Sequence, residues 1–133
     1  MDKHEKYDYW LDNAKYDLDS ADAMYKSGRW LYVVFMCQQA VEKLVKGLYI
    51  IYMDDNVPRT HNIRVITDKI EDFLPEAIPE KYFNLFEELT IYYLNGRYTD
   101  YKQKTGERID ERAASDILKR TTEVFAWLLT LKP

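Results

Sequence analysis

Positively charged and aromatic side chains alternate in one short stretch of the chain, RYTDYKQK. Arg97, Lys102 and Lys104 carry the charge, and Tyr98 and Tyr101 carry the rings. A base can stack on an aromatic ring while a neighbouring cation pairs with its phosphate. Arginine suits phosphate because its guanidinium can donate two parallel hydrogen bonds. These five residues are therefore our candidate phosphate- or nucleotide-binding residues.

The spacing of this stretch is equally compatible with a plain structural role. The tyrosines could pack against the end of a helical bundle, and Arg97 could form an ion pair with Asp100. However, the segment without helical periodicity is about sixteen residues long, and such segments are uncommon within a compact domain. The sequence alone leaves both interpretations open.

A second polar concentration lies within an apolar segment. Gln39, Glu42, Lys43 and Lys46 are three or four residues apart, which places them on one side of a helix. Glu42 and Lys46 have the favourable orientation for an i,i+4 ion pair. The periodicity slightly favours a solvated, salt-bridged stripe. The alternative is a polar groove that faces the segment after Asn95.

Other reactive residue types are few. Cys37 lies on an apolar stripe, where we expect an inert, buried thiol. His61 begins a helical segment, and a surface residue that completes a turn is the favoured interpretation over a functional one. The chain has two histidines, one cysteine, no Glu-x-x-His motif and no glycine-rich phosphate loop. We therefore expect neither a metal site nor a cofactor.

Apolar residues recur at steps of three and four through most of the chain, and no period-two alternation appears. This pattern predicts an all-α fold: one domain over residues 1–133, an up-down antiparallel helical bundle of four long helices plus one short helix. Gly28 should end the first helix, and Thr60 should cap the third. The second helix is apolar around most of its circumference and should be central. The helices are expected at about residues 5–27, 30–53, 61–73, 81–95 and 111–131.

The overall composition narrows the class of partner. The net charge is −4, whereas proteins that grip duplex DNA usually have a basic surface. Twelve tyrosines favour interfaces and stacking surfaces. No apolar run reaches the ~18 residues that span a bilayer, and the start of the chain does not resemble a signal peptide. With one cysteine as well, we expect a cytoplasmic protein that binds neither duplex DNA nor a membrane.

Three short motifs, in this order and spacing, resemble the HEPN domain family (higher eukaryotes and prokaryotes nucleotide-binding). They are QAVEKLVK at residues 39–46, THNI at 60–63 and GRYTD at 96–100. The resemblance covers nearly the whole chain. It implies a small helical bundle that is usually a homodimer. It also implies a gene often placed beside a minimal nucleotidyltransferase, in toxin–antitoxin or related pairs.

Many HEPN proteins are metal-independent ribonucleases, and their motif is an arginine followed four to six residues later by a histidine. By this resemblance Arg97 takes the place of the arginine that holds phosphate. No histidine follows it, because the residues from Tyr98 to Pro133 contain none. We therefore expect a non-catalytic protein that binds a nucleotide, RNA, phosphate or a partner nucleotidyltransferase. The supporting polar face would comprise Gln39, Glu42, Lys43, Lys46, His61 and Asp100.

Three alternatives stay open. The protein could be a ribonuclease toxin with a divergent site. It could be a purely structural homodimeric module, which the wide apolar face of the second helix and the many tyrosines favour. By resemblance to related toxins, Tyr98 or Tyr101 could also accept a nucleotidyl group from the partner enzyme.

Overall fold

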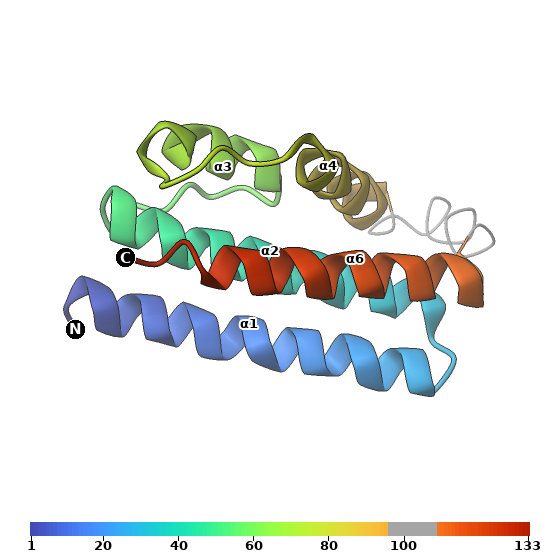
Figure 1. Ribbon diagram of the computed structural model, residues 1–133. Coiled ribbons are helices and arrows are strands. Elements are labelled where there is room, and N and C mark those ends of the chain that lie inside the picture. The colour runs from blue at the N-terminus through green and yellow to red at the C-terminus, as the bar shows by residue number, and fades with distance from the viewer. Residues whose placement is uncertain (96–108) are drawn as a thin grey trace.

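The computed structural model describes residues 1–95 and 109–133 (Figure 1). Within these residues the chain forms five α-helices and one short 3-10 helix, and it contains no strand, so the predicted all-α class is confirmed. Residues 96–108 lie outside the described part, and with them Arg97, Tyr98, Asp100, Tyr101, Lys102 and Lys104. The helices are α1 (Lys3–Lys26), α2 (Trp30–Tyr52), α3 (Ile63–Ile70), η1 (Glu71–Phe73), α4 (Glu80–Asn95) and α6 (Glu111–Leu129).

The ends of α1 are set by local sequence. Asp2 and Glu5 form a capping box, in which the Asp2 side chain accepts from the Glu5 backbone N–H at 2.8 Å. At the other end Gly28 has φ +76°, a left-handed conformation that glycine adopts without a steric cost. The predicted stop at Gly28 is confirmed, and it lets the chain reverse directly into α2.

Helix α2 is the centre of the molecule, as its composition predicts. It contacts α1, α3, α4 and α6, and its apolar side chains are buried along almost its whole length. All five α-helices contribute to one hydrophobic cluster, which includes Ala14 of α1, Leu44 of α2, Ile66 of α3, Phe86 of α4 and Val124 of α6. Helices that bury several faces at once need such a composition. No helix within residues 1–95 and 109–133 is long and apolar enough to span a membrane.

The third helix differs from the prediction at both ends. Asn62, and not Thr60, is the N-cap: its side chain accepts from the Arg64 backbone N–H at 3.1 Å. Thr60 instead accepts from the backbone N–H of Asn62, in the turn that precedes the helix. The α-helix ends at Ile70, and the tighter η1 follows. Because a 3-10 turn changes the angular spacing of side chains, Phe73 leaves the apolar face and is 58% exposed.

The arrangement of the long helices is also not the regular bundle expected. In Figure 1, α1, α2 and α6 run lengthwise across the view, whereas α4 is seen nearly end on. Helices α3 and α4 contact each other and both lie on α2. The connection between them carries Pro75 and Pro79, which prevent a continuous helix, and its Ile78 is buried in the core. An up-down arrangement of four long helices is therefore not confirmed.

Gly47 tests the contact between α1 and α2. A Cβ atom at this position would lie 3.2 Å from Cβ of Trp10 and 3.2 Å from Cδ2 of Tyr7. We expect Gly47→Leu to lower the free energy of unfolding by about 1–3 kcal/mol, because the larger side chain forces the helices apart. Urea unfolding measures this change. The control is Ala23→Leu on the exposed face of α1, which should change stability by less than about 0.5 kcal/mol. Equal effects of the two variants would contradict the close contact.

Candidate functional site

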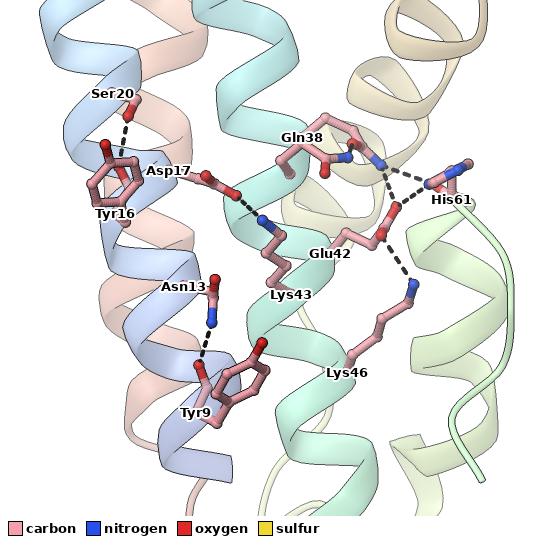
Figure 2. A network of polar contacts seen from close by, with 11 residues as sticks. Tyr9, Asn13, Tyr16, Asp17, Ser20, Gln38, Glu42, Lys43, Lys46 and His61 are labelled. Atoms are coloured by element: carbon pink, nitrogen blue, oxygen red, sulfur yellow. Dashed lines mark hydrogen bonds and ion pairs between the residues drawn. The ribbon is translucent and has the colours of Figure 1, made fainter. Parts of the chain in front are cut away.

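A buried carboxylate organises the polar residues of α2 (Figure 2). Oε1 of Glu42 accepts from Nε2 of Gln38 and pairs with Nδ1 of His61, each at 3.0 Å. Oε2 of Glu42 accepts from Nζ of Lys46, also at 3.0 Å. An ionised carboxylate only accepts hydrogen bonds, so Nδ1 of His61 carries the hydrogen of that contact. We call Gln38, Glu42, Lys46 and His61 the Glu42 cluster.

Two side chains that α2 contributes to the Glu42 cluster, Glu42 and Lys46, are largely buried. The side chain of Glu42 is 4% exposed and that of Lys46 is 12% exposed. The predicted i,i+4 ion pair is therefore present, but the solvated stripe that the periodicity favoured is not. A buried charge is tolerated only when it is paired and hydrogen-bonded, and Glu42 has three such partners.

Gln38 is the member of the cluster that sequence analysis missed. Its Nε2 donates both to Glu42 and, at 2.9 Å, to the backbone carbonyl of His61. Gln39, which was predicted, donates to Oε1 of Gln38 at 2.7 Å and so joins the cluster from its edge. The i,i+4 spacing of Gln38 and Glu42 was the available signal. The bond to the His61 carbonyl could not be read from the sequence, because the two residues are 23 positions apart.

Lys43 does not belong to the cluster. Its Nζ pairs with Oδ2 of Asp17 on α1 at 2.7 Å, and Figure 2 shows this pair on the opposite side of α2 from His61. Successive residues of a helix point about 100° apart, so Lys43 turns toward α1 while Glu42 turns toward α3. The predicted polar face is thus divided between two neighbours of α2.

His61 links the Glu42 cluster to the end of α4. Its ring centroid lies 5.1 Å from that of Tyr93, two residues before α4 ends at Asn95. The side chain of His61 is 41% exposed, so the ring is held by Glu42 on one edge and reaches solvent elsewhere. The predicted surface position of His61 is partly correct, but its ring is fixed by a buried carboxylate and not by the turn alone.

The chemistry of this arrangement follows from the two nitrogens of imidazole. When a carboxylate accepts from Nδ1–H, it fixes the ring orientation and the tautomer, and Nε2 is left as the proton acceptor. Nε2 of His61 has no hydrogen-bond partner among the described residues. The site can therefore accept or donate a proton or a hydrogen bond at Nε2. Residues 1–95 and 109–133 hold no group of three or more acidic, His or Cys side chains arranged for a metal ion.

Cys37 has no part in this site. Its side chain is fully buried on α2, and this burial raises the pKa of its thiol to about 12. A thiol with so high a pKa is not a nucleophile near neutral pH. The prediction of a buried, inert cysteine is confirmed.

The family is decided by comparison with known proteins. The model of the HEPN domain family matches residues 7–131, which is nearly the whole chain. The chain belongs to the HEPN family. No curated protein matches it significantly.

Two solved structures resemble this HEPN protein in fold. The crystal structure of ST0689, an archaeal HEPN homologue, has a TM-score of 0.74 and 21% identity, over 96% of this chain and 98% of that one. The crystal structure of TT1696 from Thermus thermophilus has a TM-score of 0.78 and 23% identity, over 94% and 97% of the two chains. At such low identities the likeness concerns the fold.

The Glu42 cluster of this HEPN protein makes a prediction about stability. Glu42→Gln should lower the free energy of unfolding by about 3 kcal/mol, because the nearly buried ammonium of Lys46 loses its counter-charge. The double variant Glu42→Gln/Lys46→Met should recover most of this loss, since it removes both charges. Urea unfolding of the three proteins measures both effects. A double variant as unstable as the single one would show that the ion pair is not the cause.

Proposed function

We propose that this HEPN protein binds the phosphate of a nucleotide or RNA beside the end of α4, and that it does not cut the ligand. The contact between His61 and Tyr93 is the observation that carries the proposal. His61 of the Glu42 cluster contacts Tyr93, which precedes Asn95 by two residues, and Arg97 follows Asn95 by two residues in the sequence. Only a few residues of chain therefore separate Arg97, the predicted phosphate anchor, from Tyr93, which contacts the Glu42 cluster on the polar side of α2.

The balance of charge supports different roles for these parts. Lys46 is paired with Glu42 and is nearly buried, so it has little charge to offer to a ligand. The positive charge would come from Arg97, Lys102 and Lys104, and the rings for stacking from Tyr98 and Tyr101. His61 would contribute a hydrogen bond at Nε2. A binding role agrees with the lack of any histidine between Tyr98 and Pro133.

Family membership supports a further part of the proposal. We propose a cytoplasmic homodimer that pairs with a minimal nucleotidyltransferase, as in toxin–antitoxin systems, with Tyr98 or Tyr101 as a site of nucleotidyl transfer. The family model matches residues 7–131, and the resemblance to HEPN proteins implies both nucleotide-binding and ribonuclease-like members. Size-exclusion chromatography of the two co-expressed proteins, followed by intact mass, tests the pairing, and separate elution with unchanged mass would reject it.

Calorimetry tests the binding proposal. ATP should bind the purified protein, and Arg97→Ala should weaken the binding at least about tenfold, because it removes a bidentate charged contact with phosphate. The control is Lys15→Ala on the exposed face of α1, which removes the same charge at a distance and should leave the affinity unchanged. No heat of binding, or equal weakening in both variants, would reject the proposal.

One observation favours a second function, metal-independent cleavage of RNA. The carboxylate of Glu42 holds Nδ1 of His61 as a general base requires. In such a reaction Nε2 would take the proton of a ribose 2′-hydroxyl. The 2′-oxygen would then bond to the adjacent phosphorus, and the bond to the 5′-oxygen would break. That oxygen would leave with a proton, and a 2′,3′-cyclic phosphate would remain on the other fragment.

The cleavage function is tested with RNA in the presence of EDTA. If His61 is the base, His61→Gln should lower the rate by about 10²-fold or more, and the products should end in 2′,3′-cyclic phosphate by mass spectrometry. His4→Gln is the matched control, because His4 is the chain's other histidine and is exposed. Intact RNA, or cleavage that survives His61→Gln, would exclude this function.

A further inference from the structure

Two surface hollows meet at Arg59, in the segment that connects α2 to α3. The first has a volume of about 340 Å³ and the second about 400 Å³. Small-molecule sites in proteins begin at about 300 Å³, so each hollow has room for a compact group. Asn56, Val57 and Arg59 line both of them. The two hollows are therefore adjacent, and Arg59 stands between them.

The first hollow has an aromatic and aliphatic wall. Trp10 of α1, Ile50 of α2 and Val57 line it, and Tyr9 lies beside Trp10 with its ring nearly perpendicular, at 6.4 Å between centroids. Nζ of Lys46 lies 5.9 Å from the centroid of the Trp10 ring. The indole of Trp10 therefore lines the hollow and already has one cation, that of Lys46, near it. A flat ring is the kind of group that such a wall accommodates.

The charged side chains of the two hollows do not cancel. Lys6 and Asp55 neutralise each other, with Nζ and Oδ2 at 2.6 Å. That ion pair, through a hydrogen bond and the charge of Lys6, holds the pKa of Asp55 below its usual value. Arg59 and Lys69 remain, and neither forms an ion pair or side-chain hydrogen bond within the described residues. An unpaired positive pair on a chain of net charge −4 favours an anionic ligand.

We propose that these hollows bind one nucleotide unit, with its base against Trp10 and its phosphate on Arg59. Lys69 lines the second hollow, where it would support the same phosphate or the next phosphate of a nucleotide chain. Arginine is the side chain best suited to hold two phosphate oxygens at once. The site goes beyond the proposed function, because it uses neither Arg97 nor His61. Ile50 is eight residues beyond Glu42 on α2, which is about 12 Å along the helix axis.

The site can be tested by NMR titration of the full chain with AMP and, separately, with inorganic phosphate. The protein has three tryptophans, so three indole N–H signals are expected, and the one that vanishes in Trp10→Phe belongs to Trp10. We expect AMP to shift the Trp10 signal and inorganic phosphate to shift it much less. Arg59→Gln should weaken the AMP effect at least about tenfold.

Two comparisons separate this site from the one beside α4. Arg29→Gln is the matched control, because Arg29 is exposed in the turn between α1 and α2, at the other end of these helices (Figure 1). Arg29→Gln and Arg97→Ala should leave the Trp10 shift intact. A Trp10 signal that does not move at about 10 mM AMP, or moves equally with phosphate alone, overturns the inference. A shift lost in Arg97→Ala but kept in Arg59→Gln also overturns it and leaves the proposed function standing.

Discussion

The burial of the Glu42 carboxylate constrains how the segment before α3 packs against α2. A charged group removed from water is strongly destabilising unless donors replace the water. Here the donors come from two places: Gln38 and Lys46 lie one turn away on the same helix, and His61 comes from the segment before α3. The helix can supply two partners by itself, but the third requires the tertiary fold. The position of α3 against α2 is thus tied to the satisfaction of a single side chain.

The same interaction explains why His61 lies where chemistry could occur. A histidine at the start of a helix is ordinarily free to rotate on the surface. In this structure its ring is fixed through Nδ1, its backbone carbonyl accepts a hydrogen bond from Gln38, and its ring lies beside that of Tyr93 at a tilt of 58°. These three contacts come from two helices, and the His61 side chain is still 41% exposed. Preorganisation of this kind serves either a hydrogen bond to a ligand or transfer of a proton.

The sequence predicts what depends on local patterns. The all-α class, the stop at Gly28, the central position of α2 and the buried Cys37 all follow from periodicity and residue type, and all agree with the structure. The up-down arrangement of four long helices is not confirmed, and the other differences involve partners that are distant in the sequence or small shifts in helical phase. The partner of Lys43 is 26 positions away, and Phe73 is exposed because the helix tightens just before it. The roles of Arg97 and the residues after it remain predictions from sequence and resemblance.

Gly47 also determines which residues of α1 and α2 face one another. The ring of Tyr7 and Cβ of Trp10 lie against the backbone of α2 at Gly47, where no side chain stands, so they occupy a notch of one residue's width. A slide of α1 by one helical turn, about 5.4 Å, would bring the Tyr7 ring and Cβ of Trp10 against side chains instead of the notch. Because the observed register places Tyr7 and Trp10 at Gly47, the notch favours that register. The absence of a side chain at Gly47 therefore helps to set the register between the two helices.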